Sequence, residues 1–250
     1  MALRTYAGGV TLDRYDDVPY FMGSSDEKRA AVTMHELEAV GIKDVCLLSC
    51  RRINPGSVGC WQCHKIGARA ALESKSDVYI LFEDNVRPSL RFDITLVRAA
   101  VDALRRRPSW KRIELATFHF VWDGITRMHT GHPHVYRRIA TKGNGTSAYV
   151  ATAQFARELL AREDETTIPI DHWTDKWSMV VYPAPFVRAT AAQVPTFIDT
   201  GKFMRIARNV CLTPWVNAVI EYLTHHLSQL IVLFIIVVIR KNRLGVHKHR

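Results

Sequence analysis

The run Asp77-Val-Tyr-Ile-Leu-Phe82 (DVYILF) is followed directly by Glu83-Asp84-Asn85 (EDN). An apolar run of this length is typical of a strand that helices bury on both faces, as in parallel sheets. Ligands of open α/β sheets bind just beyond the carboxyl ends of the strands. The polar residues after this strand are therefore candidates for a binding site.

Segments on either side of this strand alternate between short β-prone runs and helical patterns. Gly23 to Asp26 offers turn and capping residues before a helix over 27–40, and Gly41 is placed to end that helix. The alternation predicts an α/β domain with a mainly parallel central sheet covered by helices. Further strands or helices are expected over residues 18–22, 45–48, 60–72, 90–106, 111–118, 146–150 and 152–161, and an irregular stretch over 123–142.

The chain has 250 residues, of which 48% are hydrophobic and 23% charged, so it suits one large domain or two small ones. Half of its net charge of +10 comes from the basic tail, namely Arg240, Lys241, Arg243, Lys248 and Arg250. The rest is only mildly basic and has no basic stripe interleaved with aromatic residues. We therefore expect no nucleic-acid partner.

The cysteines number five, without a regular spacing, and the N-terminus lacks an apolar signal core. We expect reduced thiols and a domain that stays in the cytoplasm. Cys60-Trp61-Gln62-Cys63-His64 has the Cys-x-x-Cys-His spacing of c-type haem attachment. A redox pair and two thiols simply packed against the sheet are the alternatives, and we favour packing.

Two polar stretches also suggest ligands. His129, His132 and His134 are histidines of the kind that bind transition metals, but no Cys or carboxylate completes a known spacing, so we expect a solvated loop. Residues 142–146 (KGNGT) suggest a phosphate loop but lack both the Walker and the Rossmann spacing. Neither stretch predicts a site.

The chain changes character from Pro214 onward. Residues 230–239 (LIVLFIIVVI) carry no polar side chain and precede the basic tail. As a helix this run would extend only about 15 Å, against about 30 Å of bilayer hydrocarbon, and a longer span over 216–239 would include Glu221. We expect residues 214–250 to be membrane-associated, as a span or lying on the surface, although packing on the domain or on a partner stays open. The domain itself is expected over 14–203.

Four stretches, which follow one another along the chain in the same order as in a known family, carry a resemblance to that family. They are VPYFMGSSDEKRAAV (18–32), GSVGCWQCHKIGARAAL (56–72), DVYILFEDNV (77–86) and GTSAYVATAQFARELL (145–160) with IPIDHW (168–173). Together they resemble glycosyltransferase family 25, which includes lipopolysaccharide and collagen galactosyltransferases. The second is similar to the family's Gly-Cys-x-x-Ser-His helix, with Cys63 in place of serine. The third is similar to its Glu-Asp-Asp motif, with Asn85 in place of the last acid.

The resemblance implies a single GT-A-like domain that transfers a hexose, such as galactose, from a UDP-sugar to a hydroxyl of a glycan or protein acceptor. It places five residues near the donor: Arg29, His64, Glu83, Asp84 and Tyr149. For His64, a structural hydrogen bond to the strand end is equally open. Asp171 is the candidate general base that takes the acceptor proton, and a helix-cap, turn or metal-contact role is the alternative.

The resemblance also implies a divalent cation, Mn²⁺ or Mg²⁺, held by Asp84 and Asn85. Such an ion bridges carboxylates to the diphosphate and stabilises its departure. Asn85 offers a carbonyl oxygen but no charge. An inactive homologue that serves as a membrane-associated binding or scaffold module is therefore the alternative function.

Overall fold

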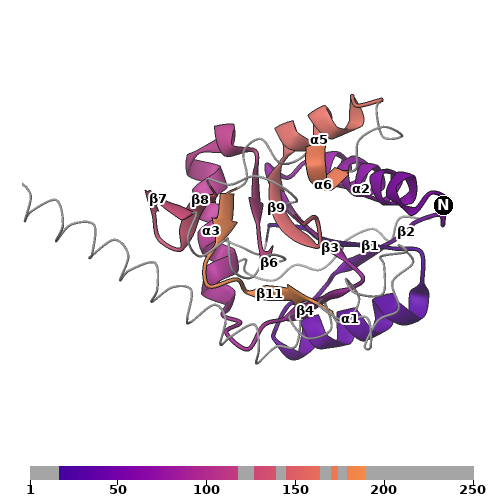
Figure 1. The fold of residues 1–250 in the computed structure, drawn as a ribbon, viewed down its shortest axis with the longest axis horizontal. Coiled ribbons are helices and arrows are strands. Elements are labelled where there is room, and N and C mark those ends of the chain that lie inside the picture. Colours follow the sequence, from indigo (N-terminus) through magenta and orange to yellow (C-terminus); the bar gives the residue numbers. More distant parts are fainter. Residues whose placement is uncertain (1–16, 118–126, 139–144, 164–169, 174–178, 190–250) are drawn as a thin grey trace, which may run out of the picture.

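A computed structural model describes residues 17–117, 127–138, 145–163, 170–173 and 179–189 (Figure 1). The elements in chain order are β1 (Tyr20–Ser24), α1 (Glu27–Ala39), β2 (Cys46–Ser49), α2 (Gly56–Glu73), β3 (Val78–Glu83), β4 (Val86–Pro88), α3 (Ile94–Arg106), η1 (Pro108–Trp110), β5 (Arg112–Glu114), β6 (Ala116–Thr117), β7 (Arg127–His132), β8 (Val135–Arg138), β9 (Ala148–Thr152), α5 (Ala153–Leu160), α6 (Ile170–Trp173), β10 (Met179–Val181) and β11 (Phe186–Arg188).

An 8-stranded sheet forms the centre, with the strand order β2-β1-β3-β9-β5-β10-β8-β7. β1 pairs in parallel with both β2 and β3, and β10 pairs in parallel with β5. β9 runs antiparallel between β3 and β5, and β8 runs antiparallel between β10 and β7. All strands of this sheet except β8 and β9 run in the same direction. The predicted α/β class with a large, mainly parallel sheet and covering helices is therefore confirmed.

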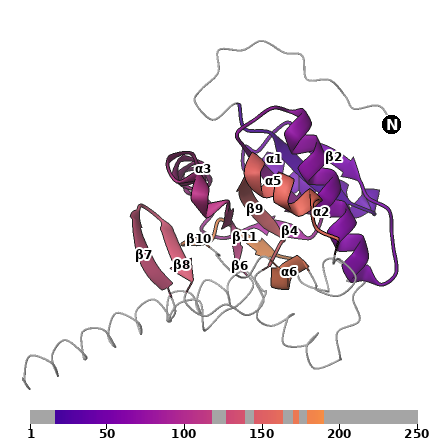
Figure 2. The ribbon, with the colours of Figure 1, turned by 90° about the horizontal axis from the view of Figure 1, so that it is seen from above.

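Helices cover both faces of the sheet, as Figures 1 and 2 show. α1 and α3 pack on one face, and α2 and α5 pack on the other. The central strand β3 alternates between these cores, with Val78, Ile80 and Phe82 facing the first and Tyr79 and Leu81 the second. Burying a large apolar side chain stabilises the fold by about 1.5–3 kcal/mol. Because β3 places such side chains in both cores, it stabilises the packing of helices on both faces of the sheet.

The ends of α1 follow the sequence signals. The Asp26 carboxylate accepts two backbone N–H groups of the first turn, at 3.0 and 3.1 Å. At the other end Gly41 has φ +89°, and the N–H of Ile42 donates to the carbonyl of Leu37 at 3.0 Å. This is a Schellman motif, with Leu37 and Ile42 both buried. The predicted cap and C-terminal glycine are both confirmed.

A 3-stranded sheet of β4, β11 and β6 lies beside the central sheet. β11 is antiparallel to β4 and parallel to β6. The N–H of Ala189, just after β11, donates to the carbonyl of Asn85 at 2.6 Å. This pairing returns a late segment of the chain to the residues that follow β3.

The hairpin of β7 and β8 replaces part of the irregular stretch predicted over 123–142, so that prediction is wrong for residues 127–138. Its histidines and glycine are poor strand formers, but β10 pairs with β8 and supplies the partners that local sequence does not specify. Among the described residues, His129 and His134 are exposed and belong to no cluster of metal-ligating side chains.

The apolar C-terminal segment, 214–250, lies outside the described residues, as do residues 14–16 and 190–203 of the predicted domain. Within the part that is described, no helix combines the length and apolar character needed to cross a membrane. The domain bounds and the membrane association stay predictions.

Candidate functional site

The candidate site lies at a topological switch point. The chain passes from β1 through α1 to β2 on one side of β1, and then through α2 to β3 on the other side. Here the Ser24 hydroxyl, at the end of β1, donates to the Asp84 carboxylate just after β3. Open α/β sheets bind their ligands at this kind of position.

Asp84 points toward α1. One carboxylate oxygen accepts from Arg29 Nη2 at 2.6 Å and the other from Ser24, while Thr33 Oγ1 donates to the Asp84 backbone carbonyl at 2.6 Å. Burial raises the pKa of Asp84 and outweighs the opposing effects of the Ser24 hydrogen bond and the Arg29 charge. We call Ser24, Arg29, Thr33 and Asp84 the α1-side cluster.

Glu83 points the other way, toward α2, because neighbouring residues of a strand face opposite sides. Thr146 Oγ1 donates to Glu83 Oε1 at 2.7 Å, and Ser147 Oγ donates to Oε2 at 3.3 Å. Burial by itself raises the pKa of Glu83, but the His64 hydrogen bond, the charges of Arg188 and His64, and the Thr146 hydrogen bond together lower it to about 2. Glu83 is therefore a carboxylate at neutral pH.

His64 is held between two groups. Its Nδ1 lies 2.9 Å from the Tyr149 hydroxyl and its Nε2 lies 3.4 Å from Glu83 Oε1. The imidazole also stacks on the Tyr149 ring, with centroids 5.7 Å apart. Burial raises the pKa of the Tyr149 hydroxyl, which therefore stays protonated. His64 and Tyr149 are only 2% and 1% exposed, so a large ligand in solvent does not reach them. We infer that Tyr149 positions His64, and that His64 in turn holds the Glu83 carboxylate in place.

Asp171, on the short helix α6, joins the α2 side through Thr146. The distance from Thr146 Oγ1 to Asp171 Oδ1 is 3.1 Å. Burial, followed by the negative charge of Glu83, raises the pKa of Asp171. A hydroxyl has one proton, so Thr146 Oγ1 can donate to either Glu83 or Asp171, but not to both at once. We call Cys60, His64, Glu83, Thr146 and Asp171 the α2-side cluster.

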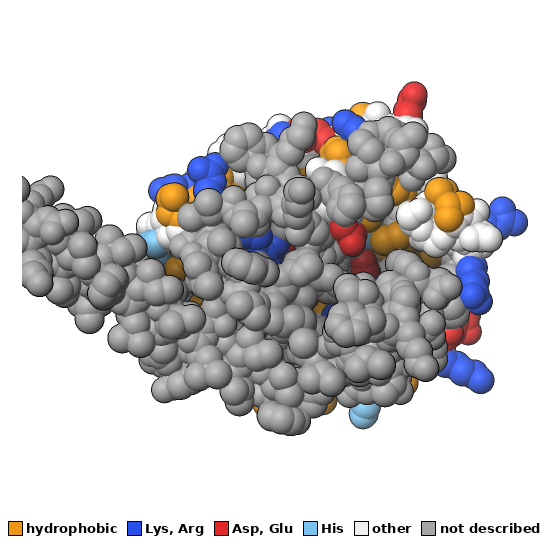
Figure 3. Space-filling model, viewed as in Figure 1, with side chains coloured by type: hydrophobic (Ala, Val, Ile, Leu, Met, Phe, Trp, Pro, Cys, Tyr) orange, Lys and Arg blue, Asp and Glu red, His pale blue; other side chains and the backbone are white. Residues whose placement is uncertain are grey.

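Apart from Asn85, the predicted site residues thus lie on two sides, the α1 side and the α2 side, that meet at the peptide bond between Glu83 and Asp84. Arg29 belongs to the α1 side, whereas His64, Tyr149 and Asp171 belong to the α2 side. In the space-filling view, acidic side chains are visible in a recess near the place of β1 and β3 (Figure 3). The acidic motif is therefore not one unit, but two carboxylates with different partners.

Asn85, the second predicted cation ligand, is buried, and its Oδ1 has no hydrogen-bond partner among the described residues. This orphaned oxygen suits a cation or a ligand donor. Asp84 suits a cation less well, because Arg29 and Ser24 already occupy its two oxygens. A cation held by both residues would first have to displace one of those partners.

Arg188 is a site residue that the sequence did not suggest. It lies at the end of β11, is half-buried, and its positive charge acts on Glu83, Asp171 and Cys60. Its approach depends on the pairing of β11 with β4, which no local pattern indicates. Thr146 and Ser147 were also missed, although a Gly-Thr-Ser stretch before a strand is a usable signal of side chains at a strand end.

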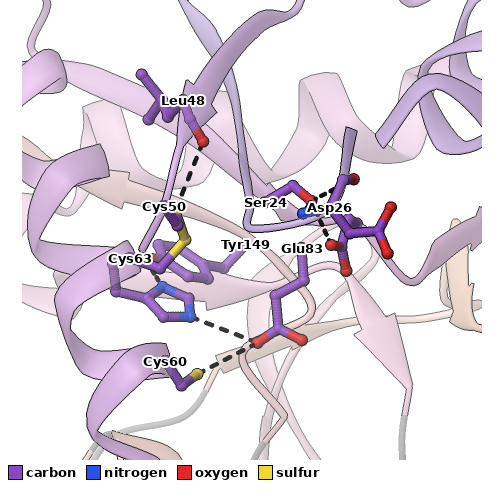
Figure 4. Close-up of a disulfide and its surroundings, with 10 residues drawn as sticks. Ser24, Asp26, Leu48, Cys50, Cys60, Cys63, Glu83 and Tyr149 are labelled. Atoms are coloured by element: carbon purple, nitrogen blue, oxygen red, sulfur yellow. Dashed lines mark hydrogen bonds and ion pairs between the residues drawn. A yellow bond between two sulfur atoms is a disulfide. The ribbon is translucent and has the colours of Figure 1, made fainter. Parts of the chain in front are cut away.

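A disulfide joins Cys50, after β2, to Cys63 on α2 (Figure 4). The expectation of reduced thiols is therefore wrong for this pair, and the cytoplasmic location stays a prediction without that support. The bond also excludes the predicted alternatives in which Cys60 and Cys63 act together, as haem attachment or as a redox pair. Cys60 remains a free thiol, 3.9 Å from Glu83 Oε1. Gly23 is needed beside the disulfide, because a Cβ there would lie 2.5 Å from Cys63 Sγ.

Comparisons with known proteins give no family. No protein-family model and no curated protein matches the sequence. Among solved structures, A197 from STIV is similar with a TM-score of 0.40 and 13% identity, over 66% of this chain and 81% of that chain. Mannose-1-phosphate geranyltransferase from Thermus thermophilus is similar with a TM-score of 0.33 and 12% identity, over 58% of this chain and 53% of that chain. Since both likenesses are weak, function is argued from the residues of the site.

Proposed function

We propose that the protein is a glycosyltransferase with a GT-A-like fold, related to family 25, that transfers a hexose such as galactose from a UDP-sugar to a hydroxyl of a glycan or protein acceptor. One observation carries the proposal. Three carboxylates, from Glu83, Asp84 and Asp171, and two arginines, Arg29 and Arg188, gather around the switch point of an α/β sheet.

The arginines are the donor-binding groups in this proposal. A nucleoside diphosphate carries several negative charges, and guanidinium groups bind phosphate oxygens in a bidentate manner. Asp84 orients Arg29 at 2.6 Å, and Arg188 reaches the same strand end from β11. His64 and Tyr149, both buried, support Glu83 behind the donor instead of touching it.

The reaction requires a base for the acceptor hydroxyl. The acceptor oxygen bonds to the anomeric carbon, the bond from that carbon to the diphosphate oxygen breaks, and UDP leaves with the bonding electrons. The acceptor proton passes to Asp171. A carboxylate whose pKa is raised, here first by burial and then by Glu83, is a better base than an ordinary aspartate.

A divalent cation, Mn²⁺ or Mg²⁺, at Asp84 and Asn85 remains part of the proposal. It would supply charge neutralisation at the departing diphosphate. The Asn85 oxygen supports such a role, whereas the Arg29 and Ser24 contacts of Asp84 oppose it. If Arg29 and Arg188 provide enough positive charge, EDTA will lower the rate without abolishing it.

UDP release is the test. The full chain is incubated with UDP-galactose, UDP-glucose and UDP-N-acetylglucosamine, with Mn²⁺ or EDTA. We expect release from one donor and a loss of roughly 100-fold or more in Asp171→Asn, the range that general-base catalysis contributes. Glu158→Gln is the matched control, since this carboxylate pairs with Lys111 at the other end of the sheet. Equal rates in Asp171→Asn and wild type would contradict the role of Asp171.

The second candidate function is an inactive homologue that binds or scaffolds at a membrane. Asn85 in place of an acid, together with the Arg29 contact that occupies Asp84, favours it. UDP binding without UDP release would identify this case. If the chain neither binds UDP nor releases it from a donor, the glycosyltransferase proposal is rejected.

Membrane association of residues 214–250 is proposed on their sequence alone. Ten apolar residues followed by a basic tail suit a surface of anionic lipid. Flotation of the full chain with phosphatidylserine vesicles, compared with neutral phosphatidylcholine vesicles, tests it. Flotation with neither kind of vesicle would refute membrane association.

A further inference from the structure

Three side chains with metal-ligating atoms meet where α2 faces the end of β3. Cys60 and His64 are four residues apart on α2, so they lie one turn apart on the same face of the helix. Their Sγ and ring nitrogen, together with a carboxylate oxygen of Glu83, all lie within 4.8 Å of one another. Figure 4 shows Cys60 and Glu83 turned toward each other.

Two of the three separations between these atoms are close to those of a tetrahedral zinc site. Zinc binds sulfur at about 2.3 Å and nitrogen or oxygen at about 2.0–2.2 Å, so neighbouring ligands of a tetrahedron lie about 3.3–3.8 Å apart. The distance from His64 Nε2 to Glu83 Oε1 is 3.4 Å, and from Cys60 Sγ to the same oxygen 3.9 Å. The set as a whole lies within 4.8 Å, so binding an ion requires side-chain rotations that bring the three atoms closer together.

The neighbours of these residues support the same role. A metal-binding histidine usually forms a hydrogen bond through its other ring nitrogen, which fixes the tautomer and the ring orientation. His64 has this arrangement, with Nδ1 2.9 Å from the Tyr149 hydroxyl. Thr146 and Ser147 likewise hold the Glu83 carboxylate. The ligands are thus positioned before an ion arrives.

The charges also favour a cation at this position. Glu83 and Asp171 bring two carboxyl groups close together on the α2 side, bridged by Thr146. A bound divalent ion would take the Cys60 thiolate as ligand, and the thiol proton would pass to solvent.

We propose that Cys60, His64 and Glu83 bind a zinc ion through one sulfur, one nitrogen and one oxygen. A thiolate and an imidazole select zinc over magnesium or calcium, which prefer oxygen ligands. The disulfide takes Cys63, so Cys60 is the thiol that α2 offers to the ion. Three protein ligands leave a fourth position for water or another group. This site is separate from the cation proposed at Asp84 and Asn85.

Titration with Co²⁺, a spectroscopic substitute for zinc, tests the site on the full metal-free chain. We expect a near-ultraviolet thiolate-to-metal band that saturates at one Co²⁺ per chain, and loss of this band when Zn²⁺ displaces the Co²⁺. Cys60→Ser should abolish the band, while Cys46→Ser, which removes the other free thiol of the described residues, should keep it. Tyr149→Phe should weaken Zn²⁺ binding about 10–100-fold, as loss of an outer-shell partner does.

A second readout needs no substitution. Bound Zn²⁺ should protect Cys60 of the wild-type chain from alkylation, as measured by mass spectrometry of its peptides, and a chelator should remove the protection. A thiolate band that persists in folded Cys60→Ser, or Cys60 alkylation that ignores Zn²⁺, would overturn the proposal. No donor sugar enters either measurement, so failure here and failure of UDP release are distinguishable.

Discussion

Replacement of Glu83 by glutamine should destabilise the protein in a way that depends on pH. The pKa of Glu83 falls from its ordinary value of 4.5 to about 2 because the His64 and Thr146 hydrogen bonds and the nearby positive charges outweigh burial. This difference corresponds to roughly 3 kcal/mol in favour of the folded protein. Since the folded pKa is the lower one, the stabilisation is complete above 4.5 and is lost as the pH falls toward 2.

Urea unfolding followed by tryptophan fluorescence measures this effect. Trp61 and Trp173 contact each other beside the site, with ring centroids 5.5 Å apart, so their emission should report unfolding of this region. At about pH 7, Glu83→Gln should be roughly 3 kcal/mol less stable than wild type, and the gap should shrink steadily below about pH 4.

The control is Glu158→Gln, which removes an exposed carboxylate 2.9 Å from Lys111. An exposed ion pair contributes about 1 kcal/mol or less, so this variant should lie close to wild type throughout. The reasoning on Glu83 is refuted if its variant loses less than about 1 kcal/mol at neutral pH, or loses the same amount at every pH.

Three further predictions test the fold. Gly41→Ala should cost about 1 kcal/mol in urea unfolding, because φ +89° strains any residue with a Cβ; an unchanged midpoint would contradict the Schellman assignment. Cys50→Ser with Cys63→Ser opens a loop of separation 13 and should cost about 3 kcal/mol, and reductant should lower the Tm of wild type but not of the variant. Glu114→Leu, which removes the carboxylate 3.1 Å from the buried Arg138 guanidinium, should cost roughly 3–5 kcal/mol, and adding Arg138→Leu should restore part of it in a double-mutant cycle.

The order of the elements could be predicted from the sequence, but their pairing could not. The apolar run before Glu83 and the capping residues of α1 are local signals, and both act as expected. The direction of β9 is different, because Ala148–Thr152 is buried throughout and a buried run has the same pattern in either direction. The hairpin of β7 and β8 was missed since its pairing with β10 outweighs weak local preference.

The site could be predicted in part for the same reason. Residues near the ends of β1 and β3 follow from the rule for α/β sheets, and Glu83 and Asp84 lie where that rule places them. Neighbouring residues of a strand face opposite sides of the sheet, so the separation of Glu83 and Asp84 onto opposite faces could have been predicted from the sequence. Arg188 and the Cys50–Cys63 bond depend on contacts between elements distant in sequence, for which one chain alone carries no signal.

The alternation of β3 has a consequence for how this chain tolerates insertions and deletions. Loss of one residue before Glu83 would exchange the two acids, so that Glu83 faced the arginine of α1 and Asp84 faced the histidine of α2. The same shift would exchange the cores that Phe82 and Leu81 face, so the deletion would disrupt folding as well as the site. We expect the length of this strand to be under stricter constraint than the identity of its individual apolar residues.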